Sequence, residues 1–535
     1  MIRLDLFGMT CADCAEAVDR SLAAVPGVRR VAVDYEAALA EVWGDADPGD
    51  LIAAVRAAGY EARLEEAGEP AAAVKNESPS PDLVVIGSGS AGVAAALEAA
   101  GRGARVWVVE SGALGGTCVN VGCVPSKTLL RAGEAAERAR RSSFPGVRPL
   151  GVEVDFPAVA AARDRLVATL RKEKYEDVLA AAGVRLVRGR ARFTDGRTLV
   201  VDGEPVGARA FLLATGAEPR LPPVPGLAAD RVWTYREAAT ARELPESLLV
   251  IGAGAVGLEL AQAYRRLGSR VTVLEAQPRI LPAEDAELAG ALQAYLEAEG
   301  IRIRTGVRVE RVEHDGGFCV RTPEGDFEAE RLLVAAGRRP RTGDLGLDAA
   351  GVALDEQGFV RVDERLATSN PRIYAAGDVA GLPQFVYVAA QSGRLAAGNA
   401  LGANERLDLR AVPRVTFTDP AIAGVGLTEI EARARFGEGV RSARLDLQDL
   451  PRALAAFDPR GFLKIVVDRD GTVLGLHVLA PEAGEVIEEG VIAVQSRSGY
   501  RDLIARYHPY LTLSEGVRLV AQALDQDVHR LSCCA

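Results

Sequence analysis

The sequence predicts an α/β protein built from several domains, and three observations support this prediction. The chain has 535 residues, which at roughly 150 residues per domain corresponds to about three or four domains. Its composition, with 48% apolar and 26% charged residues, is that of a globular protein. Two segments, 82–110 and 247–275, repeat one pattern: an apolar strand, a glycine-rich turn, an amphipathic helix and a second apolar strand ending in glutamate. Continuous apolar strands joined by helices are typical of parallel sheets.

Charge and hydropathy exclude several classes of function. The chain carries 63 Lys and Arg against 74 Asp and Glu, a net charge of −11, and it has no basic run that could neutralise a nucleic-acid backbone. We therefore expect no nucleic-acid partner. Apolar stretches such as Val84–Leu97 are interrupted by glycine and serine and fall short of the roughly 20 residues that span a bilayer. The first residues lack the apolar core of a secretory signal, so we predict a cytoplasmic protein without a membrane span.

Residues 1–65 are interpreted as a separate small domain. The pattern indicates strand, loop, helix, strand, strand and helix, with the bounds Ile2–Phe7, Ala15–Ala24, Val31–Tyr35, Leu39–Trp43 and Leu51–Ala58. The following stretch, 66–81, is rich in Ala, Pro, Ser and Glu and has no hydrophobic periodicity. Such a composition cannot bury enough surface to fold alone, so 66–81 is predicted to be a flexible linker.

The glycines of the two repeats predict two nucleotide sites. In the first repeat, Gly87 permits a tight strand-to-helix turn, Gly89 lets the backbone approach a pyrophosphate, and Gly92 permits close packing of helix on strand. The second repeat places Gly252, Gly254 and Gly257 in the same three roles. The helix that follows offers free N–H groups to an anion. Because the pattern occurs twice at equal spacing, we predict two Rossmann-type domains that bind a flavin and a nicotinamide.

The glutamate that ends each repeat bears on the type of nicotinamide. Glu110 and Glu275 stand where a ribose diol is hydrogen-bonded in such folds. A carboxylate at Glu275 suits the 2′-hydroxyl of NADH and repels the 2′-phosphate of NADPH, which prefers a nearby arginine. Arg279 is close in sequence. We predict that the enzyme uses NADH or NADPH, with NADH favoured.

Six of the seven cysteines fall in three close pairs: Cys11/Cys14, Cys118/Cys123 and Cys533/Cys534. In a reducing compartment such pairs indicate chemistry. Cys118 and Cys123 lie in GGTCVNVGCVPSK, directly after the first nucleotide unit. A helix N-terminus and the adjacent Lys127 would lower the pKa of a thiol there, which favours nucleophilic or metal-binding sulfur. The alternative is a pair of buried structural cysteines.

These motifs together carry a resemblance to a known family. GGTCVNVGCVPSK, the two glycine-rich units, the ATG at 214–216 and the YAAGDV at 374–379 resemble the flavin-dependent pyridine nucleotide disulfide oxidoreductases, over about residues 82–535. The resemblance implies an FAD-binding domain at 82–220 and 339–410, an NAD(P)H-binding domain at 221–338, and an α+β dimerisation domain at 411–535. It also implies a homodimer whose C-terminal region contributes to the partner's active site.

The resemblance assigns roles to single residues. It makes Cys123 the thiol that contacts the flavin, Cys118 the distal, exchanging thiol, and Lys127 a neighbour of the flavin. Asp378 would hold the ribityl chain of the flavin. The remaining FAD-binding candidates belong to the same motifs: Gly116, Thr117, Thr215 and Gly216.

Members of this family differ in the residues near the C-terminus that act on the substrate. Disulfide-reducing members have a His–Pro in which the histidine, the acid/base for the leaving thiol, lies five residues before a glutamate. Here the position five before Glu515 is Tyr510, and His508 lies seven before it. A phenol with a pKa of about 10 is a poor base at neutral pH. With the Cys533–Cys534 tail, and with Tyr175 matching a second tyrosine of the metal site, the chain resembles the mercuric reductases.

The N-terminal GMTCADC supports a role in metal handling. An exposed CxxC between a strand and a helix would place Cys11 and Cys14 near a helix N-terminus, where two thiolates suit a soft cation. The segment is similar to heavy-metal-associated domains, which implies a ferredoxin-like βαββαβ fold for residues 1–65. The alternative is a thioredoxin-like redox motif, for which the domain is too short.

We predict that the chain is an FAD-containing NAD(P)H oxidoreductase that reduces Hg(II) to elemental mercury. Hg(II) and small thiols would be its partners, and its metal-binding residues would be Cys11, Cys14, Cys118, Cys123, Cys533 and Cys534. Two alternatives stay open. One is a dihydrolipoyl- or glutathione-type disulfide reductase in which His508 acts as the base, and the other is a metal-delivery protein with an inert flavin body.

Overall fold

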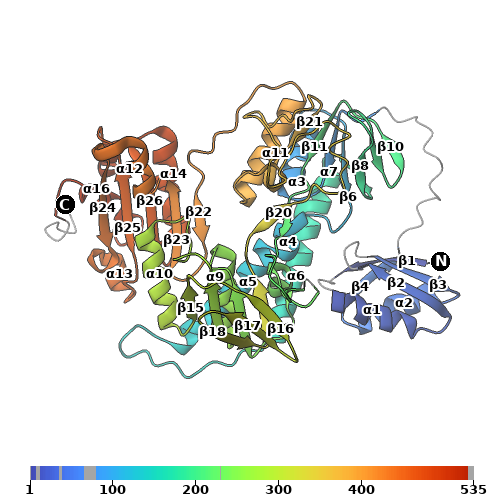
Figure 1. The fold of residues 1–535 in the computed structure, drawn as a ribbon, viewed down its shortest axis with the longest axis horizontal. Helices are drawn as coiled ribbons and strands as arrows, with labels where there is room; N and C mark the ends of the chain where they lie inside the picture. The colour runs from blue at the N-terminus through green and yellow to red at the C-terminus, as the bar shows by residue number, and fades with distance from the viewer. Residues whose placement is uncertain (1, 8–11, 35–38, 65–79, 229, 528–535) are drawn as a thin grey trace. The chain divides into compact units, whose positions relative to one another are not determined.

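The computed structural model describes residues 2–7, 12–34, 39–64, 80–228 and 230–527. The N-terminal domain has the strands β1 (Ile2–Phe7), β2 (Val28–Asp34), β3 (Leu39–Gly44) and β4 (Glu61–Leu64) and the helices α1 (Ala12–Ala23) and α2 (Pro48–Ala57). The strands form one antiparallel sheet in the order β2-β3-β1-β4, and both helices lie on one face of it (Figure 1). This is the predicted βαββαβ fold.

The rest of the chain divides into two compact units. The first comprises, beyond the N-terminal domain, residues 80–125, 160–220 and 338–407. Its centre is a parallel sheet in the order β21-β11-β5-β6-β7, with bounds β5 (Leu83–Ile86), β6 (Val106–Glu110), β7 (Arg185–Arg188), β11 (Ala210–Leu213) and β21 (Ile373–Ala375). All four residues of β5 are buried, and they alternate between two separate apolar clusters. A strand with both faces covered must be apolar throughout, which explains its uninterrupted apolar run.

Helices and small sheets complete this unit. The helical elements are α3 (Ser90–Gly101), α4 (Gly116–Val121), α6 (Phe156–Arg171), the π-helical turn η1 (Lys172–Glu176), α7 (Asp177–Ala181), η2 (Gly377–Ala380) and α11 (Val386–Ala400). The strands β8 (Ala191–Phe193), β9 (Leu199–Val201) and β10 (Glu204–Val206) form one antiparallel sheet, and β12 (Ala217–Pro219) pairs with β20 (Arg338–Pro340).

The second unit comprises residues 126–159, 221–228, 230–337 and 408–527. Its parallel sheet has the order β15-β14-β13-β19, with bounds β13 (Ser247–Ile251), β14 (Arg270–Glu275), β15 (Arg302–Thr305) and β19 (Arg331–Val334). An antiparallel sheet follows in β16 (Arg311–His314), β17 (Phe318–Thr322) and β18 (Gly325–Ala329). The helices of this region are α5 (Cys123–Arg140), α8 (Tyr235–Thr240), α9 (Ala255–Leu267) and α10 (Ala286–Ala298).

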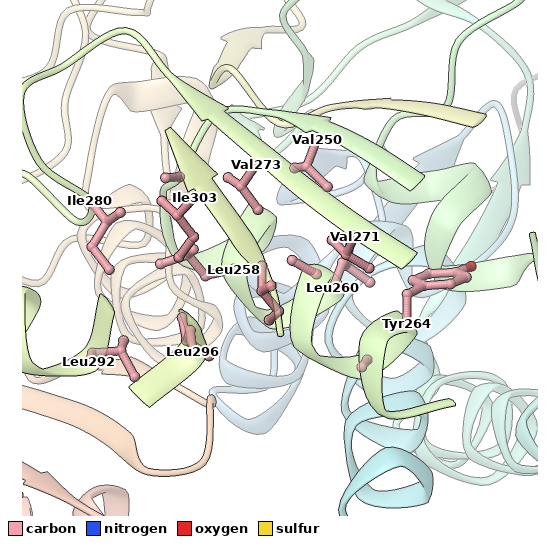
Figure 2. Close-up of a cluster of buried hydrophobic side chains, with 14 of the residues drawn as sticks. Val250, Leu258, Leu260, Tyr264, Val271, Val273, Ile280, Leu292, Leu296 and Ile303 are labelled. Atoms are coloured by element: carbon pink, nitrogen blue, oxygen red, sulfur yellow. The ribbon is translucent and has the colours of Figure 1, made fainter. Parts of the chain in front are cut away.

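The core of this region lies between the parallel sheet and its helices. Figure 2 shows Val250 and Val273 from the strands facing Leu258 and Leu260 of α9, all of them buried. Tyr264 is fully buried, and its hydroxyl donates a 2.7 Å hydrogen bond to a backbone carbonyl of α8. The one polar atom of that ring is therefore satisfied inside the apolar core.

The C-terminal part of the second unit is an antiparallel sheet in the order β22-β23-β26-β25-β24. Its strands are β22 (Arg414–Thr416), β23 (Ala421–Gly426), β24 (Arg441–Asp446), β25 (Phe462–Val467) and β26 (Val473–Ala480). Its helices are α12 (Glu429–Phe436), η3 (Gly437–Gly439), η4 (Leu447–Asp449), α13 (Pro451–Ala455), α14 (Ala483–Ser496), α15 (Tyr500–Ala505) and α16 (Glu515–Gln522). The predicted α+β character of this region is confirmed. Within the described residues, none of the helices has the length and apolarity to cross a membrane.

Candidate active site

The first glycine-rich turn joins β5 to α3 and has the geometry of a phosphate cradle. Gly87 has φ +102°, and a Cβ there would lie 2.5 Å from a backbone carbonyl oxygen of residue 214. A Cβ on Gly92 would lie 1.9 Å from the carbonyl oxygen of Gly87. A Cβ on Gly89, at the N-cap of α3, would meet nothing within 4 Å. The two outer glycines are therefore required by packing, and the middle one leaves open space in front of the helix N-terminus.

The second turn, between β13 and α9, repeats this geometry. Gly252 has φ +108°, and its Cβ would lie 2.6 Å from the carbonyl oxygen of Ala335. A Cβ on Gly257 would lie 2.0 Å from the carbonyl oxygen of Gly252, while Gly254 faces open space. Both turns can thus receive a pyrophosphate.

The glutamates that end the two repeats, Glu110 and Glu275, accept hydrogen bonds from backbone amides of their own turns. The Glu110 carboxylate accepts hydrogen bonds from the amides of Ser88 and Gly112, each at 2.8 Å. The Glu275 carboxylate accepts from the amides of Ala253 at 2.6 Å and Gln277 at 2.7 Å. Each carboxylate is fixed at the carboxyl end of a parallel strand, the edge at which such folds bind ribose.

The paired cysteines lie in a helical segment that is interrupted once. Cys118 is half-buried in α4, and Cys123 is the exposed first residue of α5. Gly116, the first residue of α4, has φ +62°, and a Cβ there would lie 2.7 Å from the Cα of Gly89. The cysteine segment therefore touches the backbone of the first nucleotide turn.

Tyr175 lies beside this segment. It belongs to the π-helical turn η1, a local irregularity that is frequent at functional sites. Its ring lies 3.4 Å from the position of a Cβ on Gly115, one residue before α4. Burial raises the pKa of the Tyr175 phenol, and the nearby Cys118 thiolate raises it further, while a hydrogen bond with Ser90 opposes the shift. The phenol therefore stays protonated at neutral pH and can donate a hydrogen bond.

Lys127 forms an ion pair within the second unit. Its Nζ lies 2.5 Å from the Glu259 carboxylate and 4.7 Å from the centre of the Phe417 ring. The other oxygen of Glu259 accepts a hydrogen bond from the Phe417 amide at 2.9 Å. The Lys127 ammonium is thus held in place by a buried carboxylate and an aromatic face.

Asp378 is also held by a cation. It lies in η2, and its carboxylate forms a 2.6 Å ion pair with Arg338. Burial raises the pKa of Asp378, and Arg338 opposes this shift. Thr215 lies in the same unit and donates its hydroxyl to a carbonyl oxygen of Arg341 at 2.8 Å, and Gly216 follows it with φ +71°.

His508 and Glu515 have different partners in this chain. The His508 ring lies 2.9 Å from the carboxylate of Glu489, and its side chain is 4% exposed. Glu515 is buried and forms a 3.6 Å ion pair with Arg518. Tyr510 is exposed on the loop before α16. His508 therefore has a carboxylate partner that the spacing to Glu515 did not reveal.

The N-terminal cysteines are described in part. Cys14 is 3% exposed and belongs to the apolar core of the domain, whereas the sequence predicted an exposed pair. The reason is helical spacing, because Cys14, Val18 and Leu22 recur every four residues on the buried face of α1. Cys11, Cys533 and Cys534 lie outside the described residues.

Comparison with known proteins identifies the family of the whole chain. Residues 81–393 match the pyridine nucleotide-disulphide oxidoreductase family, 412–521 match the dimerisation domain of that family, and 3–61 match the heavy-metal-associated domain. A mercuric reductase of Acidithiobacillus ferrooxidans is 43% identical over 99% of this chain and 98% of its own. A mercuric reductase of Shigella flexneri is 42% identical over the full length of both chains. The chain belongs to the mercuric reductase family.

Solved structures share the fold of the body of this family member. LpdA of Mycobacterium tuberculosis has a TM-score of 0.76 at 32% identity and covers 83% of this chain and 100% of its own. The Cu(II) complex of the flavoprotein disulfide reductase RclA of Escherichia coli has a TM-score of 0.76 at 30% identity over 83% of this chain and 99% of its own. As a member of this family, the chain is an FAD-dependent oxidoreductase linked to a pyridine nucleotide. It also has a dimerisation domain.

Three side chains of this family member escaped the sequence analysis: Glu259, Arg338 and Glu489, the partners of Lys127, Asp378 and His508. Each of the three lies far along the chain from the residue that it pairs with, and no known motif fixes the spacing between the two. Only Glu259 had a local signal, as a carboxylate on the apolar helix that follows the second glycine-rich turn.

Proposed function

We propose that the protein reduces Hg(II) to elemental mercury with electrons from NADH, through a bound flavin and the Cys118/Cys123 pair. The observation that carries this proposal is the contact of the cysteine segment with the first nucleotide turn, where Gly116 approaches the backbone of Gly89. Two nucleotide cradles in one chain suit a flavin and a nicotinamide. The named mercuric reductases that align over nearly the whole chain support the choice of substrate.

The residues of the first unit fit FAD. The open space at Gly89 and the free N–H groups of α3 would take the pyrophosphate, and Glu110 would take the adenosine ribose. Asp378 would hold the ribityl chain, and Gly116, Thr117, Thr215 and Gly216 would complete the part of the site that this unit supplies. When bound, FAD accepts a hydride from the nicotinamide and supplies two electrons.

The second turn fits NADH better than NADPH. Glu275 is 9% exposed, and its charge is held by two backbone amides at the ribose edge of the sheet. Arg279, the nearest candidate to bind a 2′-phosphate, donates to the carbonyl oxygens of Leu281, Pro282 and Glu284 at 2.6–3.1 Å. Because the Arg279 guanidinium donates its hydrogen bonds to carbonyl oxygens of its own loop, a 2′-phosphate would meet the Glu275 carboxylate without a compensating cation.

Cys118 and Cys123 would bind Hg(II) as the substrate between them. Two thiolates suit a soft, thiophilic cation, and exchange from one thiolate pair to the next avoids release of the free ion. Tyr175, a protonated phenol beside Cys118, would help to position the ion. Two electrons delivered to a bis-thiolate Hg(II) give elemental mercury and leave both thiolates unchanged, so the step balances.

The other cysteines would deliver the metal. Cys11 and Cys14 of the N-terminal domain would collect Hg(II), and Cys533 and Cys534 would pass it to the inner pair of the partner subunit in a homodimer, with Tyr510 near the ion. Because Cys14 is buried, this path requires that its sulfur become accessible when the metal binds. This path needs reduced thiols, so we propose that the protein acts in the cytoplasm, where thiols stay reduced.

The test is an assay of the purified yellow protein with NADH, Hg(II) and excess small thiol. We expect NADH oxidation in equal amount to mercury vapour, and loss of both in Cys118→Ala and Cys123→Ala. The Cys533→Ala/Cys534→Ala variant should be impaired when thiol is scarce. NADH oxidation only with lipoamide or glutathione disulfide would instead identify a disulfide reductase that uses His508 and Glu489. Tight metal binding without NADH oxidation would identify a delivery protein.

A further inference from the structure

Three elements meet at the point where the chain leaves α16 toward its C-terminal cysteines. Asp525 follows α16, Tyr500 is the first residue of α15, and Arg441 is the first residue of β24. The Tyr500 hydroxyl donates a 2.5 Å hydrogen bond to one oxygen of the Asp525 carboxylate. The other oxygen lies 3.3 Å from the Arg441 guanidinium. Both oxygens of Asp525 are therefore held by groups from other elements.

Tyr500 is itself fixed in position. Its side chain is buried, and its amide donates a 2.9 Å hydrogen bond to the carbonyl oxygen of Gly471. Gly471 has φ +88°, and a Cβ there would lie 2.9 Å from the Tyr500 ring, so the absence of a side chain makes room for the phenol. The guanidinium carbons of Arg441 and Arg501 lie 5.4 and 5.6 Å from the ring centre. The donor to Asp525 is thus preorganised by packing and by two cation–π contacts.

This cluster serves none of the steps assigned so far. Asp525 lies two residues before the end of the described chain, and Cys533 lies eight residues after it. A chain spans at most about 3.3–3.6 Å per residue, so a fixed Asp525 confines the first tail thiol to within about 29 Å. If the segment after α16 were released, the same thiols would explore a larger volume, and their effective concentration at any one target would fall.

We propose that Asp525, Tyr500 and Arg441 form an anchor that fixes the root of the Cys533–Cys534 tail and so sets where its thiols can deliver the metal. The three are positioning residues, and the proposal rests on the proposed function of the tail as a carrier of Hg(II). The charge balance is consistent with it. The Tyr500 hydrogen bond and then Arg441 lower the pKa of Asp525, so the carboxylate is ionised and the contact complete at neutral pH.

The anchor is tested first without mercury. Hydrogen exchange of the peptide covering residues 519–527 should become faster in Tyr500→Phe and Asp525→Asn, because each removes one part of the contact. The matched control is Asp408→Asn, which breaks an exposed Asp–Arg pair at 2.6 Å elsewhere in the same unit and should leave this peptide unchanged. Unchanged exchange in both anchor variants would overturn the proposal, whatever the enzyme reduces.

The second test is a double-variant cycle on the full-length enzyme with NADH and Hg(II) at scarce thiol. In the chain with its tail cysteines, release of Asp525 would lengthen the tether to Cys533 from the eight residues after Asp525 to the eleven after Gln522. Tyr500→Phe should therefore lower kcat/KM for Hg(II) by up to about 1.6-fold. In the Cys533→Ala/Cys534→Ala background the same substitution should add no loss, because no tail thiol is left to position. Excess small thiol should remove the effect of Tyr500→Phe in the chain that keeps its tail cysteines.

The outcomes separate the anchor from the proposed function. A loss from Tyr500→Phe that persists without the tail cysteines shows a merely structural role and overturns the anchor. Faster exchange with no change in kcat/KM, where loss of the tail cysteines does impair the enzyme, shows that the root does not position the tail and also overturns it. If removal of Cys533 and Cys534 has no effect at any thiol concentration, the proposed delivery path is wrong. The proposed role of the anchor is then wrong as well, because it depends on that path.

Discussion

The two glycine-rich turns of this chain are nearly identical in backbone geometry and differ in what lies against them. Their first glycines have φ +102° and +108°, and their third glycines would each place a Cβ within 2.0 Å of a carbonyl oxygen. At the first turn, Gly116 brings the cysteine segment to the backbone of Gly89. The middle glycines themselves are alike, because a Cβ on Gly89 or on Gly254 would meet nothing within 4 Å. The repeat supplies two open turns, and we propose that the segment inserted after the first one supplies the redox chemistry.

The largest expected effect comes from filling the space at the third glycine of either turn. Gly92→Ala and Gly257→Ala would each push a Cβ into a backbone carbonyl oxygen that cannot move aside, at a cost above about 3 kcal/mol locally. We expect Gly92→Ala to lose its yellow colour, because the flavin cradle is destroyed. Gly257→Ala should stay yellow and lose NADH-dependent flavin reduction. Absorbance of the purified proteins and anaerobic titration with NADH measure the difference, and equal colour loss in both would break the assignment of the two turns.

The next largest effect should come from Gly116, which brings the cysteine segment against the first turn. Gly116→Ala introduces a Cβ at φ +62° and 2.7 Å from the Cα of Gly89, which forces the cysteine segment away from the turn. A shift of about 1 Å in a reacting group can cost on the order of 100-fold in rate. We expect Hg(II) reduction to fall by about this factor. NADH oxidation with ferricyanide, which needs no cysteine, should be retained, and a parallel loss of both activities would contradict this explanation.

A smaller effect should distinguish the two glutamates. Glu275→Gln removes the charge and keeps an oxygen that can accept the amide of Ala253. The preference for NADH over NADPH should fall by about tenfold, which is about 1.4 kcal/mol. Glu110→Gln is the matched control in the first turn and should leave the preference unchanged. The ratio of kcat/KM for the two nicotinamides checks this, and a shift in the control variant would show that the two sites are assigned wrongly.

The smallest effect is the titration of the phenol at the first turn. Burial and the neighbouring Cys118 thiolate raise the pKa of Tyr175, so the neutral form persists above the value of about 10 of a model tyrosine. The ultraviolet difference spectrum between the native chain and Tyr175→Phe should therefore show no tyrosinate until the pH exceeds about 10. Replacing Cys118 with Ala should lower this pKa, because the thiolate charge is removed. A Tyr175 that ionises near neutral pH would show that the phenol is not a hydrogen-bond donor.

The sequence predicted the parts of the site that obey local rules. Gly87 and Gly252 were recognised because only glycine accepts the positive φ and the close carbonyl of such a turn, and the structure has both features. The continuous apolar strands were recognised because both of their faces are covered. The open space at Gly89 and Gly254 follows from the same motif, since each lies at a fixed place in the turn.

The sequence did not predict features that depend on contacts between residues far apart in the chain. The spacing places His508 out of register with Glu515 and predicts no other partner for it, whereas the structure pairs it with Glu489. Cys14 was predicted to be exposed from the CxxC pattern alone, and the apolar face of α1 buries it. Neither outcome could be read from a motif, because a motif records spacing along the chain and not which face an element turns to its neighbours.

The amino-acid sequence by itself determined the two cradles, the three cysteine pairs and the order of the domains. These depend on backbone sterics, side-chain period and local spacing, which are properties of short segments. Only the tertiary structure decided which charges meet: Glu259 with Lys127, Arg338 with Asp378, and Asp525 with Tyr500 and Arg441. Such pairs form between residues up to 132 positions apart. Glu259 and Asp378 are buried or half-buried and need partners wherever the fold brings them together, whereas the pair of Asp525 and Arg441 is exposed.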